Sequence, residues 1–219
     1  RQPQAGATAL RPGVAGALLG EGRVLATLLL WVSFFLGLLI LYLLLNWLPT
    51  LMKGRGLSDV QAAVAQIAFN AGGAVAAVWL GRFLDGPHRM RVMGAVLVIM
   101  PMLVWLLAES QAQGAAIVLI VLALGCAVMA FQAFLNSSAP LVYPLLVRGI
   151  GVGAAVAMGR FGAVVGPKLG GVWKAAGLST SQLLERLLPI VVLASIAGIA
   201  LALLGDRGRG KVPEVTPQA

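Results

Sequence analysis

Arg160 is the residue of this sequence whose type and position constrain its chemistry most. It lies near the middle of the apolar stretch 150–172, where a charged side chain costs about 2.5 to 3.5 kcal/mol on insertion scales. A guanidinium cannot escape this cost by losing its proton. The nearest carboxylates, Asp85, Glu109 and Glu185, lie outside the apolar stretches. We therefore expect Arg160 to face a water-filled cavity or a partner.

An anionic ligand would supply the partner that Arg160 lacks, because a guanidinium holds a carboxylate through two parallel hydrogen bonds. The alternative is a structural arginine, bonded to backbone carbonyl groups or to a part of the protein outside this sequence.

Asn70 is the second candidate ligand-binding residue. It lies near the middle of the apolar stretch 60–81, about level with Arg160. Its amide offers donors and an acceptor to a hydroxyl or a carboxylate, and packing against a neighbouring helix is the alternative. Gln66 lies one helical turn away on the same face.

Gln132 and Asn136 share one face of a further apolar stretch, with Phe131 and Phe134 nearby. We expect them to line the inner half of a cavity.

Tyr42 and Asn46 stand near the outer end of the stretch 24–48, beside Trp47. Tryptophan and tyrosine at such a position are typical of an interfacial belt. Asn46 followed by Pro49 would also break the helix there and free carbonyl groups for a ligand or a moving outer gate.

Several kinds of chemistry have no residues to support them. No apolar stretch contains Asp or Glu, the usual intramembrane proton carriers. The sequence also has no phosphate-binding loop, metal-ligand cluster or nucleophile–base arrangement, so we expect neither an enzyme nor a cofactor. Cys126 is the single cysteine and is expected to pack as a small apolar residue.

The composition explains where these residues must lie. Of 219 residues, 60% are hydrophobic and 11% are charged, whereas a soluble domain carries about a quarter charged residues. The net charge of +9 would suggest a nucleic-acid partner in a soluble protein. Here the basic residues lie between apolar runs and indicate membrane topology, so we expect a bilayer and no nucleic acid.

Six stretches are suited to crossing the membrane as helices, which takes about 20 residues each. They are residues 24–48, 60–81, 92–108, 114–135, 150–172 and 187–205. The fourth is expected to end near Leu135, because Asn136, two serines and Pro140 follow it. We expect residues 1–23 to be a cytoplasmic linker, 24–205 the bundle and 206–219 a cytoplasmic tail.

The basic residues also predict the orientation. With six spans both termini share one side, and that side holds most of the arginines. Because positively charged loops stay in the cytoplasm, both termini are expected there.

Small residues recur every four positions in the second and fifth stretches: Gly73, Ala77 and Gly81, then Gly162, Gly166 and Gly170. This spacing lets helices pack closely. Its recurrence in spans one to three and four to six predicts two inverted three-helix repeats, as in half of a transporter.

Short motifs then carry a resemblance to a family. Residues 81–85 read Gly-Arg-Phe-Leu-Asp, followed by His88 and Arg89. They resemble the loop signature of major facilitator superfamily transporters between helices two and three, which recurs between helices eight and nine. The family usually has a basic residue after the Asp, whereas this chain has Gly86 and Pro87 there.

Further motifs resemble the aromatic acid:proton symporters of that superfamily. Residues 46–50 are similar to the end of helix seven, residues 70–73 to helix eight, and residues 159–162, 166–167 and 170–171 to helix eleven. Tyr143, Pro144 and residues 148–153 look like the entry to helix eleven. The resemblance covers nearly the whole chain as helices seven to twelve, a C-terminal half.

The resemblance implies residues that move or gate rather than bind the substrate. They are Gly81, Arg82, Asp85, Arg89, Arg148, Pro49, Gly162, Gly166 and Pro167. Asp85 could instead cap the next helix or pair with Arg89 or Arg91.

The predicted protein is an all-α membrane protein, half of a major facilitator fold. From the resemblance we expect a secondary transporter of a bacterial inner membrane that moves an organic anion, namely an aromatic carboxylate, together with protons by alternating access. The proton-coupling group would lie in an N-terminal half outside this sequence. The alternatives are a sugar acid or another small carboxylate as substrate, a homodimer of halves, or an orphan half that acts as a membrane scaffold.

Overall fold

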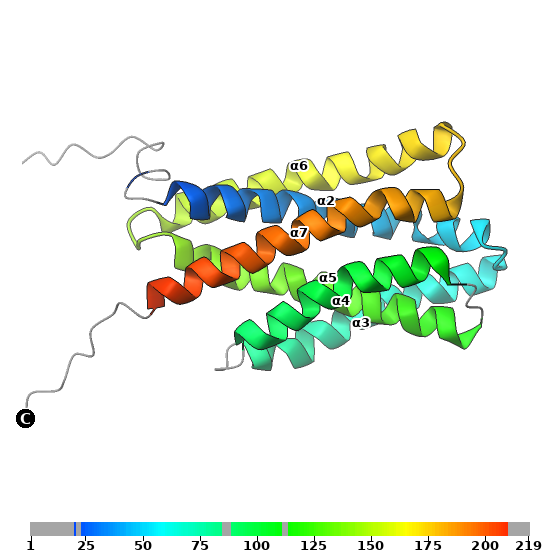
Figure 1. Cartoon of the computed structure of the whole chain (residues 1–219), viewed down its shortest axis with the longest axis horizontal. Coiled ribbons are helices and arrows are strands. Elements are labelled where there is room, and N and C mark those ends of the chain that lie inside the picture. The colour runs from blue at the N-terminus through cyan, green and yellow to red at the C-terminus, as the bar shows by residue number, and fades with distance from the viewer. Residues whose placement is uncertain (1–19, 21–22, 85–88, 111–113, 210–219) are drawn as a thin grey trace, which may run out of the picture.

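The computed structural model describes residues 20, 23–84, 89–110 and 114–209, and only the backbone at 79–84, 89 and 205–209. Six long helices make up almost all of this part of the chain (Figure 1). They are α2 (Val24–Gly54), α3 (Asp59–Leu84), α4 (Arg89–Glu109), α5 (Ala115–Val142), α6 (Arg148–Ala175) and α7 (Thr180–Arg209).

Each of the six helices contains a segment long and apolar enough to cross a membrane, which confirms the six predicted spans. All six extend beyond the predicted apolar stretches, because polar residues at a helix end can still satisfy the backbone. The predicted segments 1–23 and 206–219 lie almost entirely outside the described residues, although α7 continues to Arg209.

The predicted end of the fourth span near Leu135 is wrong, since α5 continues to Val142 with Pro140 inside it. The polar residues that follow Leu135 bond back to the helix instead of ending it. Asn136 Nδ2 donates to the carbonyl oxygen of Gln132 at 3.0 Å, and Ser137 Oγ donates to that of Phe134 at 3.0 Å. These bonds keep polar side chains satisfied within an apolar surrounding.

The predicted helix break at Asn46 and Pro49 is also wrong, since α2 runs through both residues to Gly54. Asn46 Nδ2 donates to the carbonyl oxygen of Tyr42 at 2.8 Å. Proline is tolerated within spanning helices because neighbouring groups can satisfy the carbonyl that it leaves free.

The helix packing has the predicted internal symmetry. Within the described residues, α2 packs most extensively against α6, and α3 packs most extensively against α5. In the two repeats α2 corresponds to α5, α3 to α6 and α4 to α7. The pair α2–α6 therefore corresponds to the pair α5–α3, and the pair α2–α7 to the pair α5–α4. All four of these helix pairs are in contact. The bundle therefore consists of two inverted three-helix repeats.

Glycines bring the two main helix pairs into backbone contact. A β-carbon at Gly162 would collide with the carbonyl oxygen of Phe35 on α2, and one at Gly72 would collide with that of Leu122 on α5. The predicted stripe Gly162, Gly166 and Gly170 is buried as expected. In α3, however, the closest approach is at Gly72, and the predicted stripe is only partly right because Ala77 is exposed.

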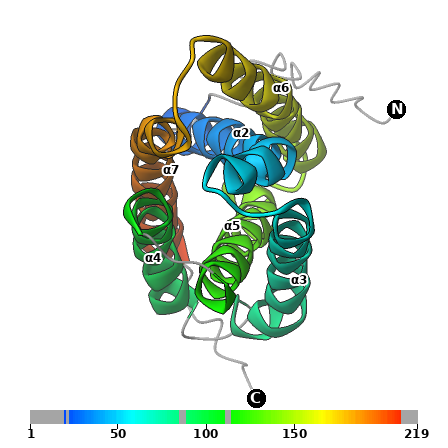
Figure 2. The same cartoon turned by 90° about the vertical axis from the view of Figure 1, so that its right-hand side faces the viewer.

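The helices form three layers (Figure 2). The helices α4 and α7 lie on one side, α3 and α6 lie on the other, and α2 and α5 lie between them. Among the described residues α3 and α6 do not contact one another. They flank the central pair on the side opposite α4 and α7.

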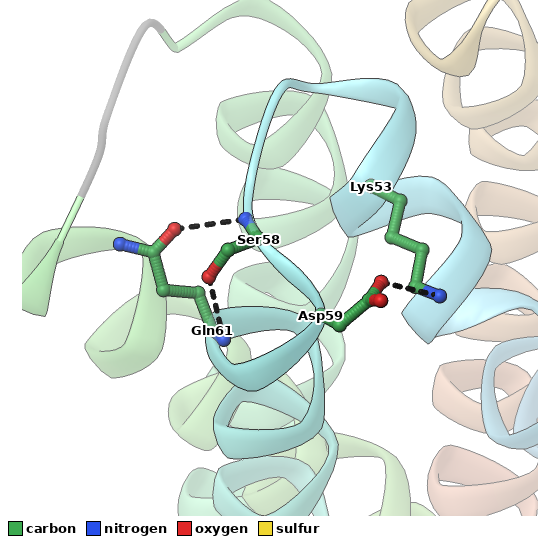
Figure 3. Close-up of polar contacts among 4 residues, drawn as sticks. All are labelled: Lys53, Ser58, Asp59 and Gln61. Carbon is green, nitrogen blue, oxygen red and sulfur yellow. Dashed lines mark hydrogen bonds and ion pairs between the residues drawn. The ribbon is translucent and has the colours of Figure 1, made fainter.

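Two loops at one end of the bundle have the same construction. In the α2–α3 loop, Gly56 adopts φ = 85°, the backbone N–H of Ser58 donates to Gln61 Oε1, and the N–H of Gln61 donates to Ser58 Oγ (Figure 3). In the α6–α7 loop, Gly177, Ser179 and Gln182 repeat this arrangement. Both loops are capping boxes, which fix where α3 and α7 begin.

Candidate functional site

Asn70 and Arg160 occupy equivalent positions in the two repeats. Asn70 lies two residues before Gly72 on α3, and Arg160 lies two residues before Gly162 on α6. Both glycines meet a carbonyl oxygen and the amide nitrogen one turn later on the neighbouring helix. Both polar side chains are exposed. The two repeats therefore present one polar residue each at the same place on α3 and on α6.

Arg160 forms no hydrogen bond and no ion pair with any described residue. Asp59 pairs instead with Lys53 at 2.6 Å, and Glu109 and Glu185 lie near helix ends. The five N–H donors of the guanidinium are thus available to a ligand or to another part of the protein. This agrees with the charge pattern, which offered Arg160 no acidic partner within the spans.

A cavity of about 300 Å³ lies between α2, α3 and α5. Its lining is almost entirely apolar and consists of Leu41, Leu45, Phe69, Asn70, Gly73, Ala74, Ala77 and Met129. Asn70 supplies the one polar side chain of this lining. The structure therefore places Asn70 beside an apolar cavity.

Gln66 and Asn70 are joined as their spacing predicts. Asn70 Nδ2 donates to the backbone carbonyl oxygen of Gln66 at 2.9 Å. Gln66 Oε1 is buried and has no hydrogen-bond partner within the described part of the chain.

Gln132 lies in the contact between α2 and α5, with 6% of its surface exposed. A β-carbon at Gly37 would lie 2.6 Å from Gln132 Nε2, so the glycine makes room for the amide. No described residue accepts a hydrogen bond from that nitrogen. Asn136, which bonds to the carbonyl oxygen of Gln132, is exposed.

Tyr42 and Asn46 stand one turn apart on α2. Tyr42 is half-buried and packs against the hydrophobic core, whereas Asn46 is exposed. Asn46, Asn70 and Asn136 thus use the same bond, from the amide nitrogen to the carbonyl oxygen four residues earlier. Each keeps its Oδ1 free of that bond.

The predicted conformational residues fall partly outside the description. Asp85 lies outside the described residues, and Gly81, Arg82 and Arg89 are described by their backbone alone. Arg148 begins α6, and its buried Nε has no hydrogen-bond partner within the described residues. Pro49 and Pro167 lie inside continuous helices.

Two interhelical contacts were not predicted from the sequence. Trp47, interpreted above as part of an interfacial belt, is half-buried, and its indole Nε1–H donates to the carbonyl oxygen of Pro167. Arg55 donates to the carbonyl oxygens of Leu107 and Ser110 at the end of α4. Nothing in the spacing of these residues identifies their partners, which are far apart along the chain.

The comparisons with known proteins agree with this fold. The family model described as the Major Facilitator Superfamily matches residues 2–167. The chain therefore belongs to the Major Facilitator Superfamily, whose members are transporters and not enzymes.

Curated relatives narrow the resemblance to aromatic acid transporters. The chain is 34% identical to the 4-hydroxybenzoate transporter PcaK of Pseudomonas aeruginosa, over 84% of this chain and 41% of that protein. It is 34% identical to the gallate transporter of Pseudomonas putida, over 92% of this chain and 44% of that protein. It is 35% identical to the 3-(3-hydroxy-phenyl)propionate transporter of Escherichia coli, over 87% of this chain and 46% of that protein. The chain thus spans less than half the length of these relatives, and the predicted resemblance is confirmed.

Proposed function

We propose that this chain is the C-terminal half of a transporter for aromatic carboxylates, in which Arg160 binds the carboxylate group. The observation that carries the proposal is an arginine in the middle of a spanning helix, exposed and without a partner among the described residues. A bound carboxylate would offset the cost of holding this charge in the membrane. The relatives that transport aromatic acids support the same substrate class.

The rest of the transporter would lie against the side of the bundle formed by α3 and α6. An N-terminal half of matching architecture would complete the cavity there, and rocking of the two halves would give alternating access. Proton coupling would depend on that half, because no predicted span of this chain contains Asp or Glu. Both termini of the chain would be cytoplasmic, given the distribution of arginines.

The other predicted site residues take secondary roles in this proposal. Gln132 and Asn136 would line the inner part of the pathway, and Tyr42 and Asn46 the outer part. Pro49, Pro167 and the glycines Gly162 and Gly166 would let α2 and α6 bend or move together, with Arg148 and the segment from Gly81 to Arg89 controlling the cytoplasmic side.

Uptake of labelled 4-hydroxybenzoate tests the proposal, in cells that express the full-length gene product containing this chain. Arg160→Ala should lower uptake about thirtyfold or more, because the carboxylate loses a charged partner. Arg160→Lys should lower it less, since it keeps the charge but loses the two-pronged geometry. Lys174→Ala, at the end of the same helix, is the matched control and should leave uptake unchanged. Undiminished uptake by Arg160→Ala at equal amounts in the membrane would overturn the proposal.

A further inference from the structure

The cavity between α2, α3 and α5 has the size and the walls that suit an aromatic ring. Its volume is about 300 Å³, and an apolar cavity of about 150 Å³ is enough to hold benzene. The walls are leucine side chains from α2, Phe69 and Gly73 from α3, and Met129 from α5. A ring with substituents would therefore fit, without the stacked aromatic residues that this sequence mostly lacks.

Gly73 and Met129 shape one wall together. A β-carbon at Gly73 would lie 2.8 Å from Met129 Cγ, so the glycine lets the methionine side chain lie against α3. Methionine adapts to irregular shapes and makes favourable contacts with aromatic rings.

Asn70 supplies a hydrogen-bond acceptor beside this cavity. A carbonyl oxygen can only accept, so the atom of Asn70 that faces the carbonyl oxygen of Gln66 must be Nδ2. This leaves Asn70 Oδ1 as the atom free of that bond. Gln66, one turn away, lies outside the lining, and its buried Oε1 has no partner within the described residues. An amide oxygen repels a carboxylate and suits a hydroxyl group, which donates.

The equivalent position on α6 has the opposite character. Arg160 carries only donors and stands two residues before Gly162, as Asn70 stands two residues before Gly72. The helices α3 and α6 flank the central pair on the same side (Figure 2). The two repeats thus offer an acceptor end on α3 and a donor end on α6.

We propose that the cavity between α2, α3 and α5 is the subsite for the ring of a hydroxylated aromatic acid, whose ring hydroxyl donates to Asn70 Oδ1. The inference rests on the proposed function, in which Arg160 binds the carboxylate. It adds that Asn70 distinguishes hydroxylated rings from unsubstituted ones.

The experiment compares 4-hydroxybenzoate with benzoate on the full-length gene product. The quantities measured are the KM for uptake of 4-hydroxybenzoate and the concentration of unlabelled benzoate that halves this uptake. Asn70→Leu keeps the side-chain size but removes the acceptor. We expect it to raise the KM for 4-hydroxybenzoate about threefold to tenfold. The concentration of benzoate that halves uptake should stay unchanged.

A second pair of variants tests the cavity itself. Ala74→Leu places a larger side chain in the lining and should weaken the binding of both compounds. Ala71→Leu is the control, because it alters an exposed alanine of the same helix outside the lining. Equal effects of Asn70→Leu on both compounds, or equal effects of the two leucine substitutions, would overturn the inference. Either result leaves the loss in Arg160→Ala to decide the proposed function separately.

Discussion

The indole Nε1–H of Trp47 on α2 donates a hydrogen bond of 3.0 Å to the carbonyl oxygen of Pro167 on α6. The indole lies over Gly170, where a β-carbon would be 2.5 Å from Cδ1 of the ring. This bond joins the two most extensively packed helices of the bundle beyond their backbone contact at Gly162. Both helices carry a proline close to it, so the bond holds together two segments whose own hydrogen bonding is interrupted.

Replacing Trp47 with Phe should lower stability by about 1 kcal/mol, because the ring stays but the interhelical bond is lost. Thermal unfolding of the purified protein in detergent would measure the change. Trp105→Phe is the control, since Trp105 on α4 is 51% exposed and should change stability little. Equal shifts for the two variants would show that the bond to Pro167 contributes nothing.

Gly162→Ala should destabilise the protein by about 1–3 kcal/mol, because the added methyl group meets the backbone of α2 and forces the helices apart. Gly153→Ala is the matched control on the same helix, where a β-carbon would meet nothing within 4 Å. It should be neutral or stabilising by up to about 1 kcal/mol, since alanine favours a helix over glycine. Denaturant unfolding in micelles would compare them, and a tolerated Gly162→Ala would contradict the close α2–α6 approach.

Arg55→Met should cost about 1–3 kcal/mol, because the carbonyl groups of Leu107 and Ser110 lose their donor. Lys53→Met, two residues away, should cost less than about 1 kcal/mol, because its ion pair with Asp59 is 53% and 83% exposed. Chemical unfolding at two salt concentrations would measure the loss of stability in each variant. Only the Lys53 effect should shrink at high salt.

The effect of Arg55 should also be constant between about pH 6 and pH 8, since a guanidinium keeps its proton there. Burial lowers the pKa of Arg55, so the folded state binds this proton less tightly than the unfolded chain does. Loss of this proton would therefore make the free energy of unfolding rise with pH. This rise would occur only in strongly alkaline solution. Loss of the Arg55→Met effect near neutral pH would contradict the assignment.

The part of the candidate site that the sequence predicted is the residue whose burial in the membrane costs free energy. Arg160 stands out because a charge in an apolar stretch needs an explanation, and the structure leaves it exposed and unpaired among the described residues. Asn70 and Gln66 were predictable as one face of a helix, because i and i+4 positions are adjacent. The cavity beside Asn70 was not, because its walls come from three helices that are distant in the sequence.

The sequence by itself determined the class of protein, the six spans and the glycine stripe of α6, because length, apolar composition and helical spacing are local properties. The tertiary structure alone decided that Gly72 rather than Ala77 meets a neighbouring helix, that α5 continues past Leu135, and that Trp47 binds Pro167. The physical reason is that lipid is as apolar as a protein core. A hydrophobic pattern therefore cannot tell the face of a helix that meets lipid from the face that meets another helix.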